Sequence, residues 1–154
     1  MADIETFILS DGVSAYCDYA LAGCSLADAH DVKTAILISL FTDRRAEDDD
    51  ILPDAGASKR GWWGDALSGR RIGSKLWLLS REKELNAVLA RAEEYAREAL
   101  AWMIDDGIAS AVEVSAENPR SGWLGIEVRA EKASTAPEKY RFEFAWRNAS
   151  EITH

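Results

Sequence analysis

The sequence LNAVLARAEEYAREALAWMIDDG, residues 85–107, carries the strongest periodic pattern in the chain. Its apolar residues recur at alternating intervals of four and three positions: Leu85, Leu89, Ala92, Ala96, Ala99 and Met103. This spacing places them on one face of a helix. Gly107 follows two aspartates and is suited to end that helix. The sequence therefore predicts one continuous helix over about residues 81–106, with an apolar face that packs on a sheet.

Downstream of this helix, residues 111–147 alternate between apolar and polar side chains. The apolar members fall in three runs: Val112, Val114 and Ala116; Leu124, Ile126 and Val128; and Tyr140, Phe142, Phe144 and Trp146. A period of two predicts strands with one buried and one solvated face. A turn at residues 118–122 and a loop containing Pro137 separate the runs. We expect an antiparallel three-stranded meander, with the long helix across its apolar face.

Upstream of the helix, the patterns are shorter. Residues 4–9 and 15–21 favour strands, and Ser10-Asp11-Gly12 between them is a turn signal, so residues 1–21 are expected to form a hairpin or edge strands. Residues 29–42 are apolar on most sides, which is typical of a buried helix. The chain is interpreted as one domain, residues 1–154. Its expected class is α+β: an antiparallel sheet of three to five strands, with the long helix and one or two shorter helices packed on one face.

Residues 43–73, before a second helical zone at residues 74–106, have neither a helical nor a strand period. A long aperiodic loop in a compact domain is either functional or disordered, and disorder goes with few aromatic residues. This loop instead contains Trp62 and Trp63 side by side. Because tryptophan and arginine predominate at interface hot spots, we expect partner contacts here. The candidate contact residues are Arg44, Arg45, Arg60, Trp62, Trp63, Asp65, Arg70 and Arg71, together with Trp123 on the solvated face of its strand.

Composition excludes several kinds of partner. The net charge is −9, from 27 acidic and 18 basic residues, which argues against nucleic acid and against an anionic membrane surface. No apolar run is long enough to span a bilayer, and the first residues lack the features of a secretory signal. Cys17 and Cys24 are too few for a disulfide framework or a zinc site. We expect no metal and no cofactor.

Catalytic patterns are sparse. His30 and His154 are the only histidines, and neither lies in a recognisable nucleophile–base arrangement. The run Asp48-Asp49-Asp50 lacks the alternate spacing of a calcium loop, so a solvated acidic loop is the favoured interpretation. Acidic residues near position 82 have no spacing that singles out a glycosidase pair. The chain is therefore not expected to be an enzyme.

Four blocks of this sequence carry a family resemblance: ISLFTDRRA (38–46), RGWWGD (60–65), GSKLWLLSREK (73–83) and ALAWMIDDG (99–107). With them the chain resembles the Mu-like prophage baseplate protein family. That family is similar to the contractile-tail baseplate wedge proteins, once called lysozyme-like, that initiate the tail sheath. The resemblance implies a structural protein of a phage or prophage tail baseplate, synthesised in the cytoplasm of the host bacterium.

The implied partners are other baseplate wedge proteins and tail sheath subunits, the latter added at a sheet edge through main-chain hydrogen bonds. Pairing of two such edges would give a homodimer of the isolated protein. Two alternatives remain open at this stage. One is a cytoplasmic adaptor of the same fold that binds a regulatory protein. The other is the glycoside hydrolase that the older family label suggests.

Overall fold

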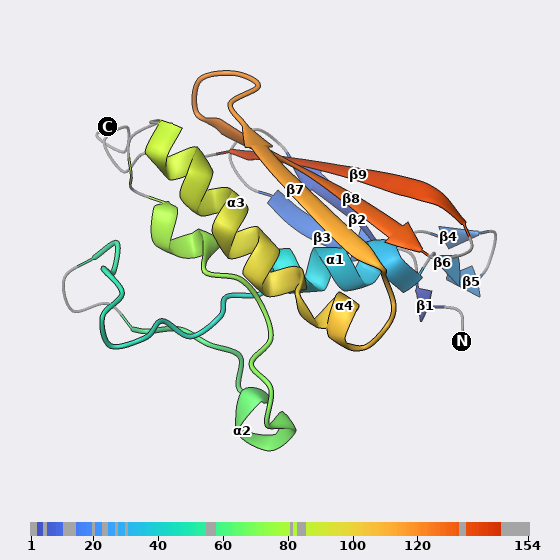
Figure 1. Cartoon of the computed structure of the whole chain (residues 1–154), viewed down its shortest axis with the longest axis horizontal. Helices are drawn as coiled ribbons and strands as arrows, with labels where there is room; N and C mark the ends of the chain where they lie inside the picture. The colour runs from blue at the N-terminus through green and yellow to red at the C-terminus, as the bar shows by residue number, and fades with distance from the viewer. Residues whose placement is uncertain are drawn as a thin grey trace.

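The computed structural model describes residues 3–4, 6–10, 15–19, 21–22, 25–26, 28–29, 31–54, 58–80, 82, 86–132 and 135–145. An antiparallel sheet of three strands carries helices on one face (Figure 1). Its strands are β7 (Ala111–Glu117), β8 (Trp123–Lys132) and β9 (Thr135–Ala145), in that order. Val114 pairs with Val128, and Ile126 pairs with Phe142. The predicted α+β class and meander are confirmed, and Trp146 lies outside the described residues.

Pro137 was expected in a loop, and this expectation is wrong, because β9 includes it. Proline has no N–H to donate, so in sheets it is confined to edge strands and irregular positions. β9 meets both conditions: it is an edge strand, and its register with β8 shifts between Ala130 and Lys132.

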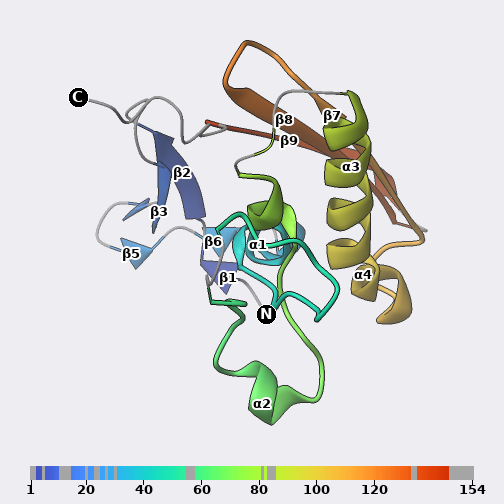
Figure 2. The ribbon, with the colours of Figure 1, turned by 90° about the vertical axis from the view of Figure 1, so that its left-hand side faces the viewer.

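Helices from two parts of the chain cover one face of the sheet. They are α1 (Asp31–Phe41), the short 3-10 helix η1 (Leu76–Leu79), α3 (Asn86–Leu100) and α4 (Trp102–Asp105). α3 packs along β7, and α1 lies beside α3 (Figures 1 and 2). The predicted buried helix at residues 29–42 and the short helical segment from residue 74 correspond to α1 and η1.

The prediction of one continuous helix over residues 81–106 is wrong, since α3 and α4 are separate. Near Ala101 the hydrogen bonds tighten to three-residue spacing: Ala101 donates to the Glu98 carbonyl at 3.4 Å, and Ile104 donates to the Ala101 carbonyl at 3.0 Å. Beyond this tightened turn, Trp102 Nε1 donates to Ser39 Oγ of α1 at 3.0 Å. A tertiary contact therefore accompanies a break that a periodic apolar pattern does not reveal.

The N-terminal strands form separate two-stranded pairs, not an extension of the main sheet. They are β1 (Asp3–Ile4) with β6 (Asp28–Ala29), β2 (Thr6–Ser10) with β3 (Ala15–Tyr19), and β4 (Leu21–Ala22) with β5 (Ser25–Leu26). The predicted hairpin is present as β2–β3, although residues 11–14 of its turn lie outside the described residues. Among described strands the main sheet has three members, the lower end of the predicted range.

The core lies between the helices and the apolar face of the sheet. Its most deeply buried large side chains are Ile36, Leu40, Leu79, Leu100, Met103, Leu124, Ile126 and Val128. Phe41 and Phe142 meet edge to face at 5.8 Å, which joins α1 to the edge strand β9. No helix among the described residues is long and apolar enough to cross a membrane. One side of α1 stays open, because Ile38 is 48% exposed.

Two neighbours in α4 give a direct test of this core. Met103 is fully buried, whereas Ile104 beside it is 47% exposed. Met103→Ala removes buried contacts and leaves a cavity, so it should lower the free energy of unfolding by about 2–5 kcal/mol. Ile104→Ala should change it by about 0.5 kcal/mol or less. Urea unfolding of both variants measures the difference, and equal midpoints would contradict the assigned packing of α4.

Candidate functional site: a projecting loop and an apolar pocket

Residues 43–54 leave the helical layer and residues 58–74 return to it, with α2 (Asp65–Ser68) at the far end of this loop. Both views show α2 projecting from the body at the end opposite the β7–β8 turn (Figures 1 and 2). The predicted loop is thus largely irregular, apart from this single helical turn, which the sequence analysis did not find. A helix of four residues is too short to produce a periodic pattern.

The two ends of the loop meet in a neck formed by residues 42–44 and 73–75. Arg44 N–H donates to the Ser74 carbonyl at 3.0 Å, and Ser74 N–H donates to the Thr42 carbonyl at 2.9 Å. Gly73 passes so close that a Cβ there would lie 2.2 Å from the Thr42 oxygen, and its φ is +99°. Only glycine meets both conditions without strain. The neck therefore fixes where the loop leaves the body.

Trp77 of η1 is buried and contacts two residues of the loop. Its indole Nε1 donates to the Arg44 carbonyl at 2.8 Å, and its ring packs under the Arg60 guanidinium at 4.5 Å. Arg60 also forms a 2.8 Å ion pair with Asp43. Arg44 and Arg60 were predicted as partner contacts. In this structure the Arg44 backbone carbonyl and the Arg60 side chain make contacts that hold the neck.

Ion pairs hold the middle of the loop. Lys75 and Asp50 pair at 2.8 Å with both side chains mostly buried, and Lys59 pairs with Asp48. The acidic run at residues 48–50 is thus partly engaged by lysines. No group of three or more potential metal ligands occurs in the part of the chain that the structure describes.

Two arginines tie the returning arm of the loop to the rest of the protein. Arg70 donates twice to Asp106 just beyond α4, at 3.0 and 2.9 Å, and its guanidinium lies 5.9 Å from the Trp102 ring. This two-bond geometry is the strong form of an arginine–carboxylate pair. Hydrogen bonding to Arg70 lowers the pKa of Asp106. Arg71 pairs with Glu47 across the loop.

The far end of the loop, residues 62–69, is here called the lobe. It exposes Trp63 (78%) and Leu67 (83%), while the Trp62 ring folds over Gly64, where a Cβ would come within 2.1 Å of it. The two indoles lie 5.3 Å apart. Asp65 accepts the Ile72 N–H at 3.0 Å and so closes the lobe. Large apolar side chains presented on an ordered projection are typical of a protein interaction site.

Not all predicted contact residues gather there. Arg45 is exposed beside Arg60 on the same loop, with Nη1 donating to the Arg60 carbonyl at 3.5 Å. Trp123 begins β8, next to the β7–β8 turn, and its half-buried ring stacks under Arg120 at 3.7 Å. That turn and α2 lie at opposite ends of the molecule (Figure 1). Trp123 is therefore separate from the lobe.

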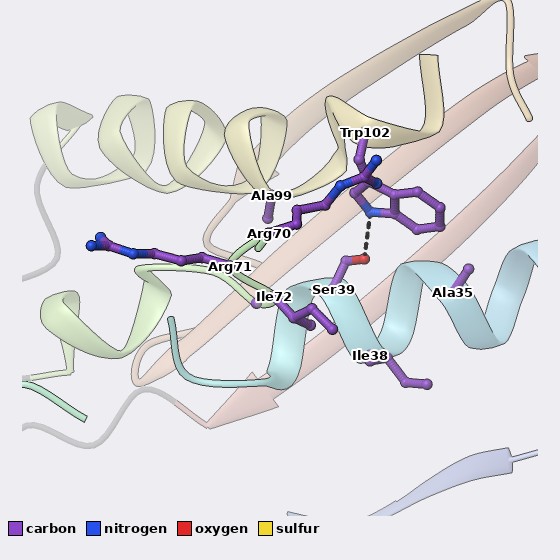
Figure 3. Close-up of a pocket in the computed structure, with 9 residues that line it drawn as sticks. Ala35, Ile38, Ser39, Arg70, Arg71, Ile72, Ala99 and Trp102 are labelled. Atoms are coloured by element: carbon purple, nitrogen blue, oxygen red, sulfur yellow. Dashed lines mark hydrogen bonds between the residues drawn. The ribbon is translucent and has the colours of Figure 1, made fainter. Parts of the chain in front are cut away.

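A pocket of about 330 Å³ lies where the returning arm passes α1, and we call it the α1 pocket. Its lining residues are Ala35, Ile38, Ser39, Arg70, Arg71, Ile72, Gly73, Ala99 and Trp102 (Figure 3). None of these lining residues is acidic. Sequence reasoning missed all of them except Arg70 and Arg71. One feature of the sequence could have pointed to the pocket. The apolar residues of α1 surround most of the helix, and Ile38 among them is 48% exposed.

The Asp50–Lys75 pair gives a pH-dependent test of the loop. Burial raises the pKa of Asp50, but hydrogen bonds from Lys75 and from the Glu47 N–H outweigh burial, so the folded pKa is lowered. A lowered carboxyl pKa stabilises the fold above about pH 4, and this stability is lost as pH falls through the folded pKa. Lys75→Met removes one of the two hydrogen-bond donors to Asp50 and leaves the carboxyl buried, so the Asp50 pKa should rise. Carboxyl-carbon NMR titration measures it, and an unchanged midpoint would contradict the pairing.

The comparisons with known proteins agree with one another. Residues 32–137 match the family described as phage protein GP46. The chain is 44% identical over 129 residues to the baseplate protein gp46 of Escherichia phage Mu, covering 84% of this chain and 89% of that protein. It is 40% identical over 130 residues to the Mu-like prophage FluMu protein gp46 of Haemophilus influenzae, with the same coverage of 84% and 89%. This chain therefore belongs to the Mu-like phage GP46 family.

Proposed function

We propose that this chain is a structural component of a contractile-tail baseplate wedge, in a phage or prophage, and that it helps initiate assembly of the tail sheath. A relative that is 44% identical over 84% of the chain is named a baseplate protein, which supports the baseplate role. The role in sheath initiation rests mainly on one observation, the unequal state of the two sheet edges. An open edge can receive a strand from a partner through main-chain hydrogen bonds.

The β7 edge is partly occupied by the protein itself. Glu93 of α3 accepts the Ala116 N–H at 2.9 Å, so this edge donor is already bonded. α3 also packs along β7. By contrast, no described strand pairs with the outer edge of β9. β9 is therefore the better candidate to receive a sheath strand.

The hydrogen bond from Ala116 to Glu93 also determines which N–H groups of β9 face outward. Because the Ala116 N–H points away from β8, its partner Ile126 directs its own N–H away from β7 and toward β9. Phe142, which pairs with Ile126, then bonds to β8. Backbone groups alternate along a strand, so the N–H groups of Arg141 and Glu143 face outward. These are the donors that an added strand would use.

Arg141→Pro tests this edge without breaking the β8–β9 ladder. It removes one outward N–H, and proline is tolerated at edge positions of this kind. We expect the variant to fold but to lose recovery of sheath protein when co-expressed with the neighbouring tail proteins. Arg141→Ala is the matched control, since it loses the same ion pairs with Glu117 and Glu143 but keeps the N–H.

Equal recovery of sheath with Arg141→Pro and Arg141→Ala would argue against strand addition at β9. Circular dichroism of both variants checks that each remains folded, so that lost binding is not lost structure.

The lobe is the proposed contact for a neighbouring wedge protein. Exposed aromatic anchors often contribute 2 kcal/mol or more at interfaces, which is about a 30-fold change in affinity. The double change Trp63→Ser and Leu67→Ser should therefore weaken wedge assembly by about that factor or more. Because both side chains are exposed, the free energy of unfolding should change by only about 0.5 kcal/mol per site.

A control for the lobe exists on the same loop. Ile51 is 88% exposed but lies outside the lobe, so Ile51→Ser removes exposed apolar surface without touching the proposed contact. Affinity measured by titration calorimetry or by quantitative co-purification compares the two variants. If Ile51→Ser weakens assembly as much as the lobe variant, the lobe is not the specific contact.

A further inference from the structure

We infer that Pro137 and Glu138 determine where an added strand must end on β9, and that they thereby fix the register in which a sheath strand pairs with this edge. The inference depends on the proposed function for the identity of the partner. It deepens that function, because it states which residues of β9 the partner uses and which side-chain pattern the partner needs. Two independent features of β9 support it: the direction of its N–H groups and the composition of its apolar face.

The main-chain donors on the outer edge of the sheet end at Pro137. β9 is the outer strand, and its pairing with β8 is regular as far as Glu138 (Figure 1). Because Phe142 bonds to β8, Tyr140 and Glu138, two and four positions before it, also bond to β8. The nitrogen of Pro137 therefore faces outward. It has no hydrogen to donate, and its ring occupies the place of a donor.

The edge that a partner can use is therefore the segment Lys139–Ala145. Its outward N–H groups belong to Lys139, Arg141, Glu143 and Ala145. The carbonyl groups of the same residues also face outward, so a partner strand can exchange hydrogen bonds with each of them. If the partner slipped by two residues toward the β8–β9 turn, one of its carbonyl groups would meet Pro137 in place of a donor. Loss of one main-chain hydrogen bond weakens binding by roughly two- to tenfold.

The apolar face of β9 ends at the same place. Phe142 is buried and its ring meets Phe41 of α1 at 5.8 Å, while Tyr140 on the same face is half-buried. The next residue on this face is Glu138, whose carboxylate accepts a hydrogen bond from the Tyr140 hydroxyl. An apolar side chain of a partner is thus favoured beside Phe142 and Tyr140 but not beside Glu138. A slip toward the turn is opposed by the side chains as well as by the main chain.

The solvated face of β9 does not select a partner by charge. Its charged side chains are already paired within the sheet, Arg141 with Glu117 and Glu143, and Lys139 with Glu127. A partner strand needs polar residues on that face, but no particular charge. The expected partner is therefore a strand of alternating residues, with its apolar members beside Phe142 and Tyr140. A slip of one residue would turn all of these apolar members to the solvated face.

Pro137→Ala tests the end of pairing directly, because it gives position 137 an outward N–H. The probe is the intact sheath subunit of the same tail, bound to the intact chain, with amide hydrogen exchange followed residue by residue. Binding should slow exchange at Arg141 and Glu143 in both proteins. In the variant, binding should also slow exchange at position 137, because pairing now continues past Glu138. The unbound variant gives the reference rate for that position.

Lys139→Pro moves the end of pairing by two residues. It should weaken sheath binding by roughly two- to tenfold relative to Lys139→Ala, which loses the same ion pair with Glu127 but keeps the N–H. Once position 139 lacks a donor, the added strand no longer reaches position 137. Adding Pro137→Ala to Lys139→Pro should therefore change neither the affinity for the sheath subunit nor the pattern of protection. Circular dichroism checks that each variant is folded.

Two results would overturn the inference. In one, the bound sheath subunit protects Arg141 and Glu143, but position 137 of the Pro137→Ala variant exchanges as it does without sheath. In the other, Pro137→Ala changes sheath binding equally with and without Lys139→Pro. Either result would leave the proposed function standing, because β9 would still receive the strand. Absence of protection along β9 in the presence of sheath would remove both.

Discussion

The contact between Gly73 and the Thr42 carbonyl is the constraint on which the shape of the projecting loop depends. A Cβ at position 73 would lie 2.2 Å from that oxygen, so the chain can return to the body at this point only through glycine. The paired hydrogen bonds of Ser74 and Arg44, and the Trp77 indole bonded to the Arg44 carbonyl, complete the neck. Fixing both ends of the loop reduces the entropy that a partner must remove on binding.

From this neck, one loop serves two surfaces. Its tip presents Trp63 and Leu67 to solvent, and its returning arm forms a wall of the α1 pocket. The pair of Arg70 with Asp106 connects the arm to the end of α4, whose Trp102 also lines the pocket. The lobe and the pocket are thus mechanically joined, while the β9 edge belongs to the rigid sheet. Such a division suits a protein that contacts more than one neighbour in an assembly.

The regular parts of the fold could be predicted from sequence because their periods are set by packing on a single core. The alternation around Val114 and Val128 and the apolar spacing of α3 both reflect one buried face. The break at Ala101 could not be predicted, because the residues on both sides of it continue the helical pattern. Pro137 was misjudged because proline is permitted in an edge strand, and sequence alone does not identify the edge.

The sequence predicted an ordered loop but not the contacts that each of its residues makes within the chain. An ordered loop with adjacent tryptophans was expected, and the exposed Trp63 agrees with that expectation. Arginines are different, because a sequence does not distinguish one that faces a partner from one paired within the chain. Arg60 contacts Trp77 and Asp43, and Arg70 pairs with Asp106, and neither contact could be read from the sequence. The α1 pocket was missed because Ala35, Ile38 and Trp102 each resemble ordinary core residues in sequence.

Amide hydrogen exchange at the neck of the free protein tests the central claim, that the loop is a pre-formed surface held at residues 42–44 and 73–75. The N–H groups of Arg44 and Ser74 are both bonded across the neck, and their exchange reports directly on its opening. The account predicts protection close to that of the buried turns of α3. Exchange at the rate of unstructured chain, in a protein whose α3 amides stay protected, would show that the neck is open and that the surface forms only when a partner binds.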